Sequence, residues 1–445
     1  MHRMNINFRT AFVFATVLLL PVSNLFAANR PPNFIVILTD DQGYADVGCF
    51  GADDLATPNL DRMRAEGMRL TDFHIQASVC SPTRAALLTG VYPKRTGITG
   101  VLSPKKHTHG LRKETPTIAE VLKPHGYATM CVGKWHVGHG PEFLPTARGF
   151  DGYFGIPYSN DMGIFNGFGE KRDLPPLPLM KNAETLEEEP DQSQLTRRYT
   201  ETAIEFIDQN HDRAFFLYFP HTFPHRPWFA SEKFRGKSKR GLYGDMIEAI
   251  DWSVGQLLTA LQRHSIDEQT IVIFTSDKGP APSKDATTPH GSAGPLRGEK
   301  FSIYEGGHRV PCIARWPKQI PANSQCDELT TAMDLMPTFA KLANAQAPQV
   351  LDGHDIWPLL SKAENAKTQY QVLIHFTGGH IGAIRRGPWK LIPHAGKKSL
   401  RGELYDLSQD LGENKNVSDQ YPELVKELTE FGETTMTTFK QTDSP

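Results

Sequence analysis

Aspartates follow two strongly apolar segments of this 445-residue chain. Asp40 and Asp41 come directly after the run NFIVILT at 33–39, and Asp277 follows TIVIFT at 270–275. Adjacent carboxylates repel each other unless a cation or hydrogen-bond donors hold them, and they suit a hard divalent ion with oxygen ligands. An isolated Asp-Asp pair is more often a turn or a helix cap. The three aspartates therefore indicate a metal site only if other reactive groups accompany them.

Cys80 begins the run CSPTRAALLTG at 80–90. Residues 81–88 predict a helix that starts at or just after the cysteine, which would place the thiol in the positive field of a helix N-terminus, a favourable place for anions. When Cys80 is considered alone, half of a disulfide is an equally good explanation. The chain has five cysteines, so at least one lacks a partner within the chain.

Strands and helices alternate along the segments that carry these residues. Apolar runs without polar alternation predict buried strands, and longer periodic runs predict helices between them. Thr57-Pro58 and Thr115-Pro116 are helix-start signals, with threonine as the N-cap and proline in the first turn. This order favours a mostly parallel α/β sheet with helices on both faces, in which functional residues gather at the carboxyl ends of strands. The predicted strands cover 33–39, 214–219 and 270–275, and the predicted helices cover 117–122, 199–209, 244–264 and 330–343.

The last part of the sequence differs from the rest. It has short strand patterns at 372–376 and 381–392, followed by a helical pattern at 421–439. We therefore expect a main α/β domain over 31–365 and a smaller antiparallel α+β subdomain over 366–445.

Two further segments carry compositional signals. Residues 174–194 are proline-rich and then acidic, which predicts a long surface loop. Residues 1–27 combine Arg3 and Arg9 with an apolar run at 11–20 that is too short to span a bilayer. We interpret them as a cleaved secretory signal, which implies a periplasmic or secreted protein without a membrane span, and a short N-terminal anchor is the less favoured alternative.

The overall composition excludes several classes of protein. Hydrophobic residues make up 39% and charged residues 22%, which is globular and argues against a disordered chain, a coiled coil or a fibre. Without residues 1–27, 46 Lys and Arg face 50 Asp and Glu. No basic excess therefore indicates a nucleic-acid partner.

The run CSPTRAALLTG resembles the full signature of the type I sulfatases, C-x-P-x-R-x-x-x-x-T-G. The matches extend from about residue 33 to about residue 411, and they look closest to the arylsulfatase A-like branch. This resemblance implies the alkaline-phosphatase-like α/β fold, with a mostly parallel sheet sandwiched by helices. The other motifs that resemble the family, in order, are NFIVILTDDQGYADVG, GKWHVG, GFDGYFGIPYSNDMG, the His225-Arg226-Pro227 turn, TSDKG and LRGEKFSIYEGGHRVP.

The resemblance gives Cys80 a chemical role. In that family the motif cysteine is oxidised to Cα-formylglycine by a separate maturation enzyme. A hydrated aldehyde has two hydroxyls on one carbon, so one hydroxyl can attack sulfur and the other can lose its proton, which reforms the aldehyde and expels sulfate. A serine or cysteine lacks this second hydroxyl.

The resemblance also implies roles for the other motif residues. Each has a plainer explanation when it is taken alone: an arginine can form a surface ion pair, a lysine is usually solvated, and a loop histidine is usually structural. His221 could be a neighbour of His225 in the pocket. The implied roles are Ca²⁺ binding by Asp40, Asp41, Asp277 and the group derived from Cys80, contact with formylglycine by Arg84, binding of sulfate oxygens by Lys134 and Lys300, collapse of the hydrate with His136 as base, and protonation of the leaving alcohol by His225.

Lys278 departs from the family pattern. The residue after the third aspartate is usually Asn or His and completes the metal site, whereas a lysine ammonium has no lone pair for a metal. Our hypothesis is that Lys278 substitutes electrostatically and contacts a carboxylate or the sulfate. The alternatives are that it turns outward and water takes its place, or that metal binding is weakened and activity is lost.

We therefore expect an exported, calcium-dependent sulfatase that hydrolyses sulfate monoesters, with carbohydrate sulfates as the favoured substrates. Asp161 and His394 are candidate sugar contacts, although ordinary loop polarity explains each nearly as well. One alternative is a phosphonate or phosphate ester hydrolase of the same superfamily, and another is a non-catalytic binder of sulfated glycans. If Cys80 is modified, the other four cysteines form an even set, and Cys312–Cys326 is the preferred bridge if any forms.

Overall fold

The computed structural model describes residues 30–442, apart from 107, 165–172, 284–288 and 394–401. The predicted signal at 1–27 and the predicted sugar contact His394 lie outside the described residues.

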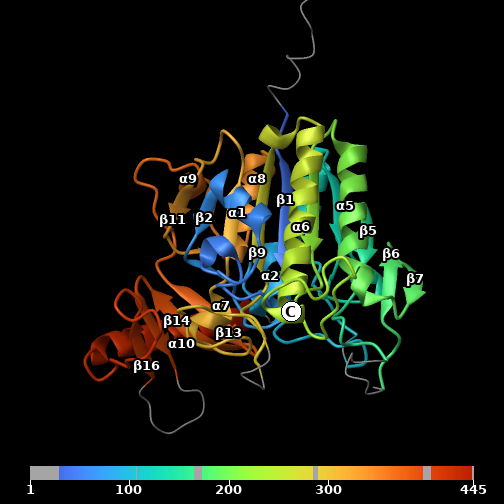
Figure 1. Cartoon of the computed structure of the whole chain (residues 1–445). Coiled ribbons are helices and arrows are strands. Elements are labelled where there is room, and N and C mark those ends of the chain that lie inside the picture. The colour runs from blue at the N-terminus through green and yellow to red at the C-terminus, as the bar shows by residue number, and fades with distance from the viewer. Residues whose placement is uncertain (1–29, 107, 165–172, 284–288, 394–401, 443–445) are drawn as a thin grey trace, which may run out of the picture. The chain divides into compact units, whose positions relative to one another are not determined.

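A ten-stranded mixed sheet has the strand order β11-β2-β10-β9-β1-β8-β4-β5-β6-β7 (Figure 1). Its strands β9, β1, β8, β4 and β5 are neighbours and run parallel. The three predicted strands are β1, β8 and β9, so these predictions are confirmed. The strand bounds are β1 Asn33–Thr39, β2 Met68–Leu70, β4 Ala128–Val132, β5 Gly152–Gly155, β6 Pro178–Lys181, β7 Glu184–Glu188, β8 Phe215–Pro220, β9 Thr270–Ser276, β10 Cys312–Arg315 and β11 Ser324–Cys326. A separate two-stranded sheet joins β3 (Phe73–His74) and β12 (Thr330–Thr331).

Helices cover both faces of the large sheet, as predicted. Phe34, Val36 and Leu38 of β1 pack in a buried apolar cluster with residues of α2, α4 and α8. Ile35 and Ile37, on the opposite face, pack in a second cluster with residues of α1, α5 and α6, and Figure 1 shows α5 and α6 along this face. Among the described helices, none is both long and apolar enough to cross a bilayer. The helix bounds are α1 Pro58–Ala65, α2 Cys80–Thr89, α3 Pro93–Thr96, α4 Ile118–Leu122, α5 Leu195–Asn210, α6 Gly241–Arg263, α7 Glu305–His308, α8 Leu335–Leu342, α9 Trp357–Leu360 and α10 Pro422–Thr442.

The two helix-start signals have different outcomes. Thr57 is the N-cap of α1, as predicted. The prediction at Thr115 is wrong, because α4 begins at Ile118 and its N-cap is Thr117. The Thr117 hydroxyl accepts a hydrogen bond from the backbone N–H of Glu120 at 3.1 Å, and the Glu120 carboxylate accepts one from the N–H of Thr117 at 2.7 Å. This reciprocal capping box satisfies two backbone donors, which Thr115 could not do from its position.

Residues 174–194 are not a long loop, so this prediction is also wrong. They contain β6 and β7, an antiparallel hairpin that pairs with β5 and extends one edge of the sheet. Asn182 turns the hairpin with a φ of 56°, in the left-handed region that asparagine tolerates. The strand β7 is mostly exposed and acidic. It lacks the apolar alternation by which a strand is recognised, and such charge is typical of sheet edges.

A four-stranded antiparallel sheet lies near the C-terminal end, as predicted, in the order β13-β14-β15-β16. The predicted strand at 381–392 is two strands, which are joined by a turn at Gly387-Pro388 where the glycine has a φ of 55°. The helix α10 packs on β14 and β15. The boundary near residue 366 stays a prediction. The strand bounds are β13 Leu373–Thr377, β14 His380–Arg386, β15 Trp389–Ile392 and β16 Glu403–Asp406.

Buried charges connect this sheet to the segments around β3 and α7. Arg385 of β14 donates two parallel hydrogen bonds to Asp72, from Nη1 to Oδ1 at 2.8 Å and from Nη2 to Oδ2 at 2.7 Å. The Lys390 ammonium of β15 lies 2.9 Å from Glu305 Oε1 and 2.8 Å from Glu413 Oε1. We call this group the C-terminal charge cluster, and its members are Asp72, Glu305, Arg309, Arg385, Lys390 and Glu413.

All five cysteines are free thiols, and the preferred bridge is wrong. Cys312 of β10 and Cys326 of β11 both lie opposite Leu70 of β2, one on each side. Two strand spacings, roughly 9–10 Å, therefore separate them. A disulfide cannot reach across this distance, because it needs α-carbons within about 7 Å.

Candidate active site

Eight of the predicted site residues lie just after the carboxyl ends of four neighbouring parallel strands, β9, β1, β8 and β4. The strand order thereby brings together residues that are distant in sequence, such as Asp41 and Asp277, which are 236 positions apart. The side chains are Asp277 and Lys278 after β9, Asp40 and Asp41 after β1, His221 and His225 after β8, and Lys134 and His136 after β4.

Close backbone packing fixes the turn after β4. Gly133 has a φ of 129°, and a β-carbon at this position would lie 1.9 Å from the carbonyl oxygen of Pro220. The next residue, Lys134, donates its backbone N–H to the same oxygen at 2.8 Å. Asp41 and His136 have positive φ values of 69° and 63°. Such backbone conformations are costly for non-glycine residues, and they are typical of functional sites.

Arg84 is fully buried and holds two of the aspartates, so it is not a surface ion pair. Its Nε donates to Asp277 Oδ2 at 2.9 Å, and its Nη2 donates to Asp40 Oδ2 at 3.1 Å. Its Nη1 donates to the backbone carbonyl of Lys134 at 2.5 Å. Burial lowers the pKa of Arg84, but Asp277 and Asp40 outweigh burial and raise it, so the guanidinium stays charged.

Lys134 and Lys300 point at the aspartates rather than into solvent. The Lys134 ammonium donates to Asp40 Oδ2 and, at 3.1 Å, to Ser159 Oγ. The Lys300 ammonium donates to Asp41 Oδ2 at 2.9 Å, and its side chain is 11% exposed. Both lysines are therefore placed to hold an anion beside the carboxylates.

The Lys278 ammonium lies among all three aspartates. It donates to Asp40 Oδ1 and, at 2.8 Å, to Asp277 Oδ1, and it lies 2.9 Å from Asp41 Oδ1. The hypothesis that Lys278 contacts a carboxylate is confirmed, and the alternative in which it turns outward is wrong. We call this group the catalytic charge cluster, and its members are Asp40, Asp41, Arg84, Lys134, Asp277, Lys278 and Lys300.

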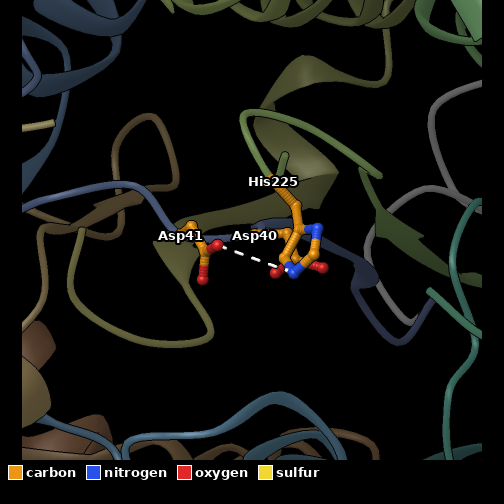
Figure 2. A group of neighbouring side chains, drawn as sticks. All are labelled: Asp40, Asp41 and His225. Carbon is orange, nitrogen blue, oxygen red and sulfur yellow. Dashed lines mark ion pairs between the residues drawn. The ribbon is translucent and has the colours of Figure 1, made fainter. Parts of the chain in front are cut away.

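The side chains around the aspartates are only partly suitable as ligands for a metal ion. Oxygens of Asp40 and Asp41 and a ring nitrogen of His225 lie within 4.8 Å of one another, and Figure 2 shows the His225 imidazole beside the two aspartates. Ca²⁺ accepts carboxylate oxygens as ligands. An ion among the three aspartates, however, would need the Oδ1 atoms that the Lys278 ammonium contacts, so the residues as placed do not fit the predicted ion.

Hydrogen bonding fixes which nitrogen of His136 carries the proton. Its Nε2 lies 2.8 Å from the carbonyl oxygen of Leu102, which can only accept, so Nε2 carries the proton. Nδ1 therefore has the lone pair, and among the described residues it has no hydrogen-bond partner. Burial, with a smaller effect from Lys134, holds the pKa of His136 well below its usual range. The imidazole is therefore neutral in the free protein, with its lone pair on Nδ1.

Asn160 fixes the opposite tautomer in His225, with the proton on Nδ1. The Asn160 amide donates from Nδ2 to Gln192 Oε1 and to the carbonyl of Pro227, so its Oδ1 faces His225 Nδ1 at 3.0 Å and accepts from it. The other nitrogen of His225, Nε2, lies 3.7 Å from Asp41 Oδ2 (dashed line in Figure 2). A second proton would therefore sit on Nε2, facing the aspartates.

The pKa of His225 is also lowered well below its usual range. Burial is the main cause and Lys300 adds to it, whereas Asp40 and Asp161 oppose them. The nearby His221 is buried beside Phe219, and burial lowers its pKa to about 3. Burial raises the pKa of Asp161, but His225, Ser159, Lys134 and Lys300 reverse this effect. Asp161 is therefore close to the reactive groups.

Cys80 is the first residue of α2, as predicted, and it is 3% exposed. The adjacent Ser81 side chain accepts a hydrogen bond at 3.1 Å from the N–H of Leu102, the residue whose carbonyl fixes His136. Burial lowers the pKa of Lys278, and Asp277, Asp40, Asp41 and, last, Cys80 raise it. The thiol is thus close to the catalytic charge cluster.

Sequence reasoning missed several residues that position the site. Ser159 contacts Lys134 and Asn160 contacts His225, although both lie in the motif GFDGYFGIPYSNDMG. That motif was the available signal. Leu102 acts through its backbone carbonyl, which no side-chain pattern could indicate.

Comparison with known families decides which family the chain belongs to. The sequence profile of the Sulfatase family matches residues 32–345, which include every residue of the catalytic charge cluster. The chain belongs to the sulfatase family. A second profile, described as N-sulphoglucosamine sulphohydrolase, C-terminal, matches residues 298–436 of this sulfatase.

Individual relatives show which branch of the family this chain is most similar to. Human arylsulfatase A is 39% identical over 93% of this chain and 89% of its own length. Mouse N-acetylgalactosamine-6-sulfatase is 36% identical, with 93% of this chain and 82% of its own length covered. The crystal structure of Ps i-CgsB, at 30% identity, has a TM-score of 0.80 over 92% of this chain and 93% of that chain. The predicted arylsulfatase A-like branch, the alkaline-phosphatase-like fold and the activity of a sulfuric ester hydrolase are confirmed.

Proposed function

We propose that this sulfatase is exported and hydrolyses carbohydrate sulfate monoesters, with a formylglycine formed from Cys80 as its nucleophile. The observation that carries the proposal is the convergence of Cys80, at the start of α2, with the catalytic charge cluster and two histidines of opposite orientation. A hydrated formylglycine supplies two hydroxyls on one carbon, so that one can form a bond to sulfur and the other can later release it. The maturation enzyme that would oxidise Cys80 is part of the proposal.

The chain's own residues would bind the sulfate and move the protons. Lys134 and Lys300 neutralise sulfate oxygens in a largely water-excluded site, where such charges act strongly. His136 accepts a proton at Nδ1, the nitrogen that Leu102 leaves unprotonated. His225 delivers a proton from Nε2 to the leaving alcohol.

An anionic substrate would help His225 to act as an acid. Lys300 lowers the pKa of this histidine in the free enzyme. A sulfate ester bound at Lys300 offsets that positive field and favours the protonated imidazole. The mechanism therefore couples substrate binding to protonation of the acid.

The proposal needs a positive charge among the three aspartates. Calcium is the sequence-based prediction, and carboxylate oxygens are its usual ligands. Lys278 supplies a charge at the same place. No step above depends on an ion there.

The proposed substrate class rests on the relatives and on the residues near the site. One relative at 36% identity is named as an N-acetylgalactosamine-6-sulfatase. The crystal structure of Ps i-CgsB in complex with k-i-k-neocarrahexaose, at 30% identity, has a TM-score of 0.79. Asp161 lies close to His225 and Lys300, so we propose it as a contact for a sugar hydroxyl.

A desulfation screen over defined sulfated mono- and oligosaccharides tests the function. The enzyme is first checked by mass spectrometry for conversion of Cys80, and Cys80→Ala serves as the inactive control. We expect sulfate release from at least one carbohydrate by the converted enzyme alone. Cleavage of aryl phosphonates without any desulfation would replace the proposal with a phosphonate hydrolase. A converted enzyme that cleaves neither would be a non-catalytic binder of sulfated glycans.

A further inference from the structure

The side chain of Lys278 is completely buried, and its ammonium faces one Oδ1 atom from each of Asp40, Asp41 and Asp277. An ammonium has three N–H donors and no acceptor. Two of these contacts are hydrogen bonds, and the third, to Asp41, is an ion pair. The charged group is therefore surrounded by the three carboxylates that a divalent cation would need.

The backbone holds Lys278 in this position from both sides. The N–H of Asp277 donates to the carbonyl of Thr39 at 2.9 Å, and the N–H of Gly279 donates to the carbonyl of Gly307 at 3.2 Å. The carbonyl of Lys278 itself accepts a hydrogen bond from Ser276 Oγ at 2.8 Å. The residue is thus fixed between the end of strand β1 and the segment of α7, and its side chain extends from this point into the cluster.

Space and chemistry exclude a shared site. The Lys278 nitrogen lies 2.8 Å from Asp277 Oδ1 and 2.9 Å from Asp41 Oδ1. A calcium ion binds carboxylate oxygens at 2.3–2.6 Å, and so it would occupy nearly the same volume. The ammonium has no lone pair and cannot become a ligand. Either the ammonium or the ion can be present, but not both.

Formal charge favours the ammonium. The catalytic charge cluster contains three carboxylates and four cationic side chains, so it has one positive charge in excess. A sulfate monoester brings one negative charge, which makes the occupied cluster neutral. A divalent ion in place of the ammonium would leave two positive charges in excess before substrate binds, in a buried site where like charges repel strongly.

We propose that the Lys278 ammonium takes the place of the divalent cation, so that this sulfatase binds no Ca²⁺ between its aspartates and works without it. The proposal deepens the proposed function and rests on it for the statement about turnover. All the Lys278 protons face carboxylates. It therefore acts on the substrate through its charge, while Lys134 and Lys300 supply the donors to the sulfate.

Metal content and calcium-dependent stability test the inference without reference to activity. The full chain is dialysed against EDTA and then against buffer with about 1 mM CaCl₂, and bound metal and thermal unfolding are measured. We expect no stoichiometric Ca²⁺ or Mg²⁺ in the wild type, and a Tm that calcium changes by less than about 1 °C. One tightly held ion per chain, whose removal by EDTA lowers the Tm, would overturn the proposal.

Two variants sharpen the test. Lys278→Asn removes the ammonium and adds a side-chain oxygen, so it should bind one Ca²⁺ per chain and gain about 3 °C or more in calcium. Lys278→Met removes the charge but adds no ligand, so its gain in calcium should be smaller than that of the Asn variant. If neither variant shows any response to calcium, the three aspartates are not a latent metal site and the inference is wrong. If the variants do not fold, the metal content of the wild type alone decides.

Activity is measured separately. Sulfate release by wild type in EDTA should stay within about twofold of its rate in calcium, and loss in EDTA that calcium restores would overturn the inference. If the converted enzyme releases no sulfate under any condition, the proposed function fails. The metal content would still decide whether Lys278 replaces the ion.

Discussion

Two buried charge clusters in this sulfatase are both built from carboxylates, arginines and lysines, but they differ in the balance of negative and positive charge. The C-terminal charge cluster has three carboxylates and three cations, namely Asp72, Glu305 and Glu413 against Arg309, Arg385 and Lys390. The catalytic charge cluster also has three carboxylates, but it has four cations. The first is formally complete without a ligand, whereas the second retains one positive charge for an anion.

This difference in charge balance illustrates two roles that buried ion pairs can have. A balanced cluster adds little net stability compared with apolar packing, yet removing one partner leaves an uncompensated buried charge and is costly. The C-terminal charge cluster thus ties β14 and β15 to the segments around β3 and α7. An unbalanced cluster keeps its excess charge only because the fold holds it, and this charge is available for the substrate. The two clusters should therefore respond differently to mutation.

The largest expected effect is on activity. Cys80→Ala removes the proposed nucleophile, so sulfate release should fall by about 10⁴-fold or more. The free energy of unfolding should change by less than about 1 kcal/mol, because the substitution removes one small buried atom. Both are measured on the purified variant, with Cys49→Ala as a control for the loss of a half-buried thiol. If Cys80→Ala keeps its activity, the catalytic charge cluster does not act through covalent chemistry at this residue.

The second effect is on stability. Lys390→Met leaves Glu305 and Glu413 buried without their shared cation, so the free energy of unfolding should fall by about 3–5 kcal/mol. Turnover by the folded fraction should change little, because Lys390 contacts no residue of the catalytic charge cluster in the described structure. Urea unfolding and active-site-normalised rates measure the two quantities. The control Arg197→Ala breaks an exposed ion pair with Glu201 and should cost about 0.5 kcal/mol or less. A tenfold loss of turnover in Lys390→Met would show that the clusters are coupled.

The third effect depends on the leaving group. His225→Gln removes the proposed acid, so cleavage of a sugar sulfate should slow by about 10²–10³-fold. An aryl sulfate releases a stable phenolate and needs less protonation, so its cleavage should slow much less. The comparison of kcat for the two substrates measures this difference. Asn160→Ala should reproduce the same pattern more weakly, because Asn160 orients the imidazole. Equal losses on both substrates would assign His225 to binding instead.

The smallest effect is a pH dependence. Burial raises the pKa of Asp72, but Arg385 and Arg309 outweigh it and hold the pKa below its ordinary value of 3.8. The unfolded chain therefore takes up this proton at a higher pH than the folded protein does, so the stabilisation is present above pH 3.8 and is lost as the pH falls. Asp72→Asn should cost about 1–3 kcal/mol at neutral pH, with a difference from wild type that shrinks in acid.

Urea unfolding of both proteins at about pH 7, 4 and 2.5 measures this trend. Asp208→Asn, at an exposed pair with Arg263 whose side chains are 53% and 40% exposed, should show little difference at any pH. A constant difference between wild type and Asp72→Asn across the range would mean that the carboxylate is not stabilised by charge.

Sequence patterns predicted the central strands and the reactive residues because both are local signals. The apolar runs of β1 and β9 place Asp40 and Asp277 at strand ends, and the run from Cys80 to Gly90 is continuous in sequence. The acidic edge strand β7 gave no such signal, since edge strands need not alternate. The strand β2 lies between Cys312 and Cys326 and rules out a bridge between them. The spacing of the two cysteines in the sequence does not reveal this strand.

The position of Lys278 also needed the structure. The sequence left three possibilities for its side chain, and only the placement of β9 beside β1 shows that the ammonium faces the aspartates. The C-terminal charge cluster was not foreseen at all. Its partners Asp72 and Arg385 are 313 positions apart, and neither lies in a motif.

The burial of Cys80 has a consequence for the order of oxidation and folding. A thiol that is 3% exposed at the first residue of α2 offers almost no surface to a modifying enzyme in the folded protein. On the proposed chemistry, oxidation must therefore precede folding of this helix, and the two processes compete in time. A chain that folds too quickly would be stable, correctly shaped and inactive. The fraction of active molecules then records the outcome of this competition, and slower folding of α2 would raise the specific activity.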